Sequence, residues 1–143
     1  MKDSRVYIPL GVAEMEELSA SRSLSALPVA GFAVTPELRS AHPGEDDEGW
    51  EYLAMQDAAT GAAGRGLRVV AAADLPDSSV GEGASSDDPA EVTIIDEVSL
   101  RRIASLHVLD PAGERDVDSD FELSWYDVTE LDVVIDLVRA DRS

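Results

Sequence analysis

A run of small and β-branched residues in the middle of the chain constrains the fold most. Residues 67–73 read LRVVAAA, and apart from Arg68 they are apolar at both the odd-numbered and the even-numbered positions. Successive side chains of a strand point to opposite faces, so this run predicts a central strand that is covered on most of both faces. Such a strand needs a sheet around it and packed elements on both sides. The chain is therefore expected to be an α/β (α+β) protein.

Five further segments predict strands of the same sheet. Each is short and rich in β-branched, aromatic or other apolar residues, and most end at a turn-forming residue. They are residues 5–9, 31–34, 92–95, 102–109 and 123–126. Together with the central strand they predict a mixed β-sheet of about five to six strands with helices packed against it.

Apolar residues recur at helical spacing in four places. The first is at residues 12–18. A second, short helix begins at Thr35 and Pro36, an N-cap residue followed by proline at the first helical position. The third and principal helix follows the acidic residues 45–48, whose charge suits a helix N-terminus, and packs through its alanines. Thr129 is expected to cap a fourth, C-terminal helix.

The length of 143 residues suits a single α/β domain over 1–143. Two acidic stretches interrupt the regular pattern. Residues 75–90 are rich in Ser, Gly, Pro and carboxylates, which predicts a flexible loop. Residues 110–121 form a second acidic loop. Its alternate aspartates resemble the start of a calcium loop, but Phe121 and Asp127 stand where such a loop needs Gly and Glu, so a solvated loop is expected and no metal site is assigned.

The charge of the chain restricts its partners. Thirty Asp and Glu residues face eleven Lys and Arg residues, which gives a formal net charge of −19. Direct binding to nucleic acid or to an anionic membrane is disfavoured because both need a cationic surface. A basic partner protein would be attracted. No apolar run approaches the ~20 residues of a membrane span, and no signal-peptide pattern is present, so a cytoplasmic location is expected.

Several catalytic chemistries are excluded by residues that the chain lacks. It contains no cysteine, which rules out disulfides, thiolate catalysis and cysteine-ligated metals. Only His42 and His107 are available for a histidine site. No serine lies in a nucleophile elbow, and no phosphate-binding glycine loop follows a strand. No catalytic residue, metal or cofactor is therefore assigned.

The densest group of polar and aromatic residues lies near the end of the chain. With the histidine of the preceding strand, the candidate partner-binding residues are His107, Trp125, Tyr126, Asp127 and Glu130. Large aromatic residues beside carboxylates make good anchors for a partner's Arg or Lys. The alternative is that strand alternation sends Trp125 into the core and Tyr126 to the rim, while Asp127 only ends the strand.

His107 also has two interpretations. Alternation places Ile103, Ser105, His107 and Leu109 on one face of their strand. His107 is then either a histidine hydrogen-bonded within the sheet or a general acid–base beside a carboxylate.

Three functions follow from these residues. The leading hypothesis is a non-enzymatic interaction or regulatory module whose acidic surface binds a basic protein partner. An alternative is a small enzyme that uses Tyr, His and carboxylate side chains, with His107, Asp127 and Glu130 as acid–base candidates, which requires that at least two of these converge in one pocket. A second alternative is a mimic of nucleic acid, which predicts one broad acidic face.

Several segments together resemble a family of small actinobacterial proteins that is known only as a domain of unknown function. The resemblance rests on residues 5–9 (RVYIP), 32–39 (FAVTPELR), 48–52 (EGWEY), 68–76 (RVVAAADLP), 107–108 (HV) and 125–131 (WYDVTEL). It implies an actinobacterial cytosolic protein, in agreement with the use of Arg in place of Lys. Residues 77–89 depart from the family pattern, so a site that depends on them is not expected.

Overall fold

The computed structural model describes residues 3–25, 29–83, 88–109 and 121–141. Its main strands are β1 (Asp3–Leu10), β3 (Val29–Ala33), β4 (Val69–Pro76), β5 (Val80–Glu82), β6 (Glu91–Ile94), β8 (Ile103–Leu109) and β9 (Leu123–Asp127). They form one seven-stranded sheet in the order β5-β6-β3-β1-β4-β8-β9. Two short strands, β2 (Ser23–Leu24) and β7 (Val98–Ser99), pair separately.

All four predicted helices are present. They are α1 (Val12–Ser21), α2 (Pro36–Ala41), α3 (Asp47–Gly64) and α4 (Leu131–Asp141). The predicted start of α2 is confirmed, because the Thr35 hydroxyl accepts a hydrogen bond of 3.0 Å from the backbone N–H of Leu38. Asp46 caps α3 in the same way, through a bond of 2.9 Å from Gly49 N–H. Short 3₁₀ turns also occur at η1 (Asp77–Ser79), η2 (Leu100–Arg102) and η4 (Val128–Glu130).

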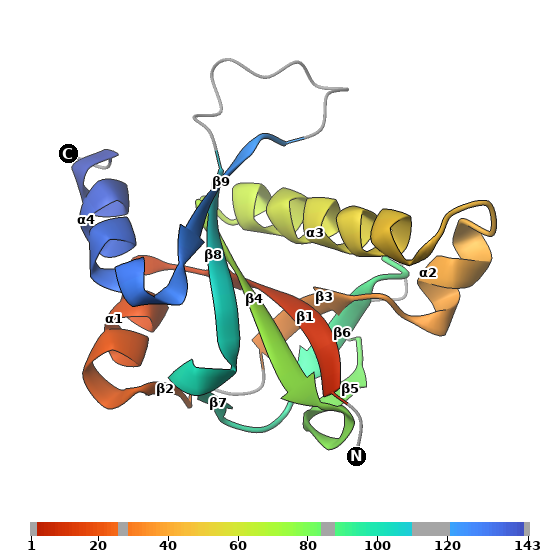
Figure 1. Cartoon of the computed structure of the whole chain (residues 1–143), viewed down its shortest axis with the longest axis horizontal. Coiled ribbons are helices and arrows are strands. Elements are labelled where there is room, and N and C mark those ends of the chain that lie inside the picture. The colour runs from red at the N-terminus through yellow and green to blue at the C-terminus, as the bar shows by residue number, and fades with distance from the viewer. Residues whose placement is uncertain (1–2, 26–28, 84–87, 110–120, 142–143) are drawn as a thin grey trace.

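The helices cover both faces of the sheet (Figure 1). α3 lies across β1, β3 and β4 on one face, and α1 and α4 pack together against the other. The predicted central strand is confirmed in β4. Its Val70 and Ala72 are buried with the alanines of α3, while Val69, Ala71 and Ala73 are buried with α1 and α4. Both cores therefore depend on the one apolar run.

The close packing of α3 comes from its small residues. Ala54, Ala58 and Ala62 are fully buried against the sheet. A Cβ added at Gly61 would lie 3.1 Å from the ring of Phe32, which is tighter than ordinary contact. The helix axis can therefore lie nearer to the strands than larger side chains would permit.

The sheet differs from the predicted one in two ways. It has seven strands instead of five to six, and every neighbouring pair runs antiparallel, so it is not mixed. The additional strand is β5, which lies inside the stretch 75–90 that the sequence predicts to be a loop. β4 also continues into that stretch, as far as Pro76. Of the two predicted acidic loops, residues 84–87 and 110–120 lie outside the described residues, together with the three alternate aspartates.

A bulge in β8 separates residues that simple alternation places together. Ala72 pairs with Ser105 and Ala73 with Ile103, so Ala104 has no partner in β4. The extra residue turns Ile103 into the core beneath α1 and α4, while Leu109 stays in the core beneath α3. The prediction that Ile103 shares a face of the strand with Ser105, His107 and Leu109 is therefore wrong.

None of the described helices combines the length and the apolar character that crossing a lipid bilayer requires.

Candidate functional site

β8 and β9 lie at one edge of the sheet. On the face of the sheet against which α3 packs, these two strands carry a polar and aromatic surface. Cross-strand pairing sets this surface, because Ser105 pairs with Asp127 and His107 pairs with Trp125. Paired residues share a face of the sheet. We call Ser105, His107, Trp125 and Asp127 the open sheet face, because α3 packs mainly on β1, β3 and β4 and does not bury Trp125.

Trp125 is the most prominent member of the open sheet face. Its exposed fraction is 62%, whereas Tyr126 is partly buried and packs against the core beneath α1 and α4. The expectation that alternation sends Trp125 into the core and Tyr126 to the rim is therefore wrong. The two side chains do point to opposite faces, but α4 contacts β9 on the Tyr126 side, whereas α3 does not cover Trp125. Tyr126 consequently lies apart from the other candidate residues.

His107 is held within the sheet by its neighbour on the same strand. A distance of 2.9 Å joins its Nε2 to the Ser105 hydroxyl, and Ser105 is itself buried. Burial lowers the pKa of His107, and the positive charge of Arg5 lowers it further. The imidazole is therefore neutral at pH 7 and adds no positive charge to the open sheet face.

An ion pair borders the open sheet face on β1 and β4. The Nε of Arg5 lies 2.7 Å from Oδ1 of Asp74, which is the residue opposite Arg5 in the sheet. Tyr7 is the next residue of β1 on the same face. Burial raises the pKa of Tyr7, and the carboxylate of Glu51 on α3 raises it further, so the phenol stays protonated at neutral pH. Arg5, Asp74 and Tyr7 are not among the partner-binding residues that the sequence predicts.

The carboxylates of Asp127 and Glu130 bind the turn that follows β9. Asp127 accepts hydrogen bonds from the backbone N–H of Thr129, at 3.0 Å, and from its hydroxyl, at 2.6 Å. These bonds lower the pKa of Asp127. The carboxylate of Glu130 accepts a bond of 3.0 Å from the N–H of Asp127. Asp127, and not Thr129 as predicted, therefore caps the C-terminal helical segment, and both carboxylates have a structural role in that cap.

The described residues bring no group of three or more His, Asp or Glu side chains together that could hold a metal ion. The site instead offers an exposed indole, a neutral imidazole and flanking carboxylates. A protein-family model described as a family of unknown function, DUF6912, matches residues 4–135. The chain belongs to this family. No curated protein and no solved structure matches the chain.

This DUF6912 chain also has a pair of carboxyl groups away from the open sheet face. Asp57 on α3 lies beside Asp88, which precedes β6 and accepts a bond of 2.9 Å from the N–H of Ala90. Burial, the negative charge of Asp88 and a hydrogen bond between the two carboxyl groups raise the pKa of Asp57 to about 7. Near pH 7 a fraction of the molecules therefore carries a protonated Asp57 beside Asp88, where α3 meets the segment before β6.

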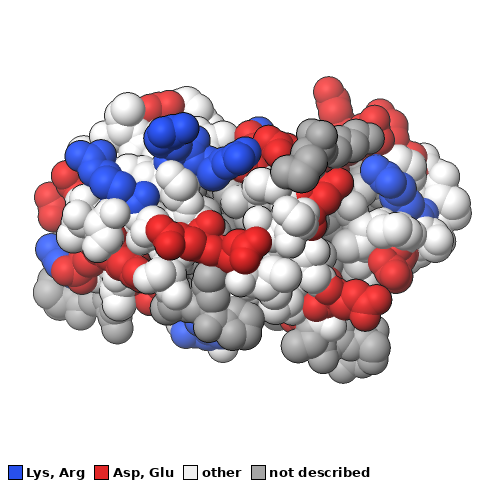
Figure 2. Space-filling view, turned by 90° about the horizontal axis from the view of Figure 1, so that it is seen from below, with Lys and Arg blue, Asp and Glu red and all other residues white. Residues whose placement is uncertain are grey.

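The surface seen in Figure 2 carries charges of both signs. Lys and Arg side chains lie among Asp and Glu side chains on this view of the DUF6912 chain. Among the described residues, Arg102 and Asp3 form one ion pair, at 3.0 Å. A nucleic-acid mimic requires one broad acidic face, and this face does not have that character.

Proposed function

We propose that the protein is a binding module that takes up an extended, positively charged segment of a partner protein along β9. The exposure of Trp125 carries this proposal. An indole that is 62% exposed on a sheet is costly to leave in water, and buried Trp anchors dominate the energetics of many interfaces. We assign no chemistry to the site, because Asp127 and Glu130 are engaged in the cap after β9.

The position of β9 supports an extended partner. β9 is the last strand of the sheet and has β8 as its one neighbour among the described strands. An edge strand presents unpaired N–H and C=O groups, and a partner segment that adds to the edge satisfies them. The side chains of such a segment would alternate, so that every second one packs beside Trp125.

The charges around β9 support a basic partner. Glu122 precedes the strand and is exposed, and Asp127 and Glu130 follow it. The Arg5–Asp74 pair is internally neutral, and His107 is uncharged at pH 7. A partner's Arg or Lys therefore meets carboxylates and an aromatic face, both of which favour a cation.

Titration with designed peptides tests the proposal. The probes are an eight-residue peptide of alternating Arg and Val and a matched peptide of alternating Glu and Val. We expect the Arg peptide to shift the NMR signals of the β9 amides and the Trp125 indole, and Trp125→Ala to weaken its binding at least about tenfold. Tyr52→Ala is the control, since Tyr52 is also an exposed aromatic residue, at 44%, but lies on α3.

Two outcomes would contradict the proposal. One is equal binding of the Arg and Glu peptides, which would remove the role of charge. The other is unchanged binding by Trp125→Ala, or signal changes confined to residues away from β9.

A further inference from the structure

A second candidate site lies on the opposite side of the sheet, between α1, η2 and the start of α4. It is a cavity of about 260 Å³. Leu100, Val128 and Leu131 provide apolar walls, and Arg22 and Asp132 provide charged groups. The cavity belongs neither to the open sheet face nor to the Asp57–Asp88 pair. Its volume suits a ligand of a few carbon atoms.

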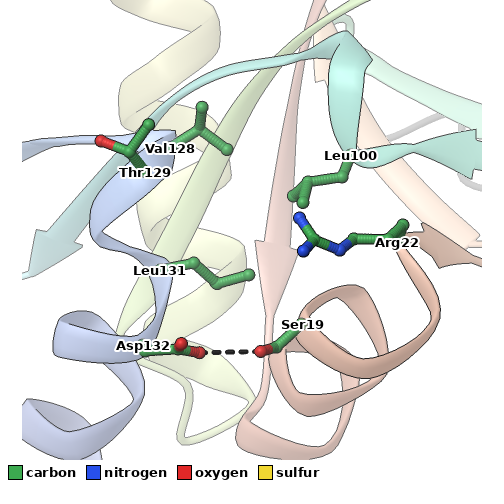
Figure 3. A pocket seen from close by; sticks show the side chains of 7 residues that line it. All are labelled: Ser19, Arg22, Leu100, Val128, Thr129, Leu131 and Asp132. Atoms are coloured by element: carbon green, nitrogen blue, oxygen red, sulfur yellow. Dashed lines mark hydrogen bonds between the residues drawn. The ribbon is translucent and has the colours of Figure 1, made fainter.

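Arg22 is the distinctive residue of this cavity. Figure 3 shows its guanidinium directed into the space between Leu100 and Leu131. No ion pair or side-chain hydrogen bond joins this guanidinium to another of the described residues, although the chain carries a large excess of carboxylates. Asp132 lines the same cavity, but its Oδ1 accepts a 2.7 Å hydrogen bond from the Ser19 hydroxyl. Among the described residues the Arg22 guanidinium therefore has no ion-pair partner, although the Asp132 carboxylate lines the same cavity.

The backbone of Arg22 adds a second, independent observation. Its φ angle is +64°, in the left-handed region, and it is the one non-glycine residue with a positive φ in the part of the chain that the structure describes. Helices commonly end with glycine in this conformation. Here an arginine occupies the position and is fixed on both sides: Arg22 N–H donates to Leu18 O at 3.0 Å, and Leu100 N–H donates to Arg22 O at 2.8 Å. A strained residue that is held in this way beside a cavity is characteristic of functional sites.

We propose that this cavity binds a small organic monocarboxylate, with its carboxylate on Arg22 and its aliphatic body against Leu100, Val128 and Leu131. A guanidinium pairs with a carboxylate through two parallel hydrogen bonds. The apolar walls favour an organic acid over an inorganic anion. Asp132 disfavours a ligand with more than one negative charge, because the second charge would be repelled.

Calorimetric titration with hexanoate tests the proposal, with hexanol and inorganic phosphate as comparisons. We expect hexanoate to bind with a dissociation constant of about 1 mM or tighter, and each comparison ligand at least about tenfold more weakly. Hexanol keeps the aliphatic body without the carboxylate, and phosphate keeps the negative charge without the body. Equal binding of either one, or no hexanoate binding at about 20 mM, overturns the proposal.

Arg22→Gly is the decisive variant. Glycine adopts the positive φ without strain, so the variant is expected to fold with an unchanged or higher melting temperature and to bind hexanoate at least about tenfold more weakly. Arg101→Ala removes an exposed arginine of η2 that does not line the cavity, and it should bind hexanoate as the wild type does. Hexanoate binding that survives Arg22→Gly contradicts the proposal.

The two proposed sites are tested separately. Trp125→Ala removes the anchor of the open sheet face and should leave hexanoate affinity unchanged. A loss of hexanoate binding in Trp125→Ala as large as that in Arg22→Gly would overturn the assignment of the ligand to this cavity.

Discussion

Trp125 combines a large apolar side chain with a position that the fold leaves in water. It is the most exposed of the large apolar side chains of the described residues. The hydrophobic contribution of a side chain scales with the area removed from water, so most of what Trp125 could contribute is not realised in the free protein. Its role is therefore expected to appear in binding and not in folding.

A pair of substitutions measures this difference. Trp125→Ala should lower the free energy of unfolding by less than about 1 kcal/mol. Leu106→Ala, at a fully buried position of the adjacent strand, should lower it by about 2–5 kcal/mol, because it leaves a cavity in the core. Urea unfolding monitored by far-UV circular dichroism gives both values. A loss of several kcal/mol in Trp125→Ala would show that the indole is buried in solution.

At the scale of elements, side-chain periodicity in the sequence predicts six strands of the main sheet and all four helices. β5 was missed because its three residues, Val80, Gly81 and Glu82, lie among acidic, Gly-rich neighbours and show no apolar alternation. Its place in the sheet comes from pairing with β6, which is a non-local interaction. Short edge strands of this kind leave almost no local signal in the sequence.

The candidate site was predicted only in part, for a similar reason. Alternation indicates that Trp125 and Tyr126 point to opposite faces, but it does not say which face the helices cover over β9. That depends on where α3 lies, and α3 is positioned by Ala–sheet contacts that are distant in sequence. The pairing of His107 with Trp125 depends on strand register, which the bulge at Ala104 also influences.

The contact between α3 and the segment before β6 should make stability depend on pH. Folding raises the pKa of Asp57 from 3.8 to about 7, because of burial and the neighbouring Asp88. Between these values the folded state binds more protons than the unfolded state. The resulting stabilisation is fully present below the unfolded pKa and is lost as the pH rises through about 7.

Asp57→Asn removes this dependence. We expect it to be more stable than the wild type by about 1 kcal/mol at pH 8, after allowance for solvent screening of this half-buried group, and by clearly less at pH 5, where only part of the stabilisation has been lost. Urea unfolding of both proteins at the two pH values gives the difference directly. Asp88→Asn keeps an oxygen for the Ala90 N–H and serves as the matched variant, with the same expected trend. An identical difference in stability at both pH values would contradict the raised pKa of Asp57.

At the scale of the whole molecule, the excess of carboxylates is the dominant property. The formal net charge is −19, because 30 Asp and Glu residues outnumber 11 Lys and Arg residues. Ion pairs such as Arg102–Asp3 and Arg139–Glu16 therefore cannot provide a partner for most of the carboxylates. Like charges repel most strongly in the compact state, so the free protein pays for its acidity in stability. A basic partner would neutralise part of this charge, which links the proposed function to the stability of the fold.

Salt should therefore act in opposite directions on the free protein and on its complex. Raising NaCl from about 20 mM to about 500 mM shortens the screening length to a few ångströms. At pH 7 this should raise the melting temperature of the free protein by about 3 °C, because self-repulsion weakens. The same change should weaken binding of the Arg peptide at least about tenfold.

A control near the isoelectric point separates charge screening from a general effect of salt on apolar burial. Close to pH 4.1 the net charge vanishes, so the rise in melting temperature should disappear if screening causes it. Differential scanning calorimetry at low protein concentration measures both conditions. An equal rise at pH 4.1 and pH 7 would instead indicate that salt strengthens hydrophobic burial. Repulsion between carboxylates would then not destabilise the free protein, and a cationic partner would not stabilise the fold by relieving it.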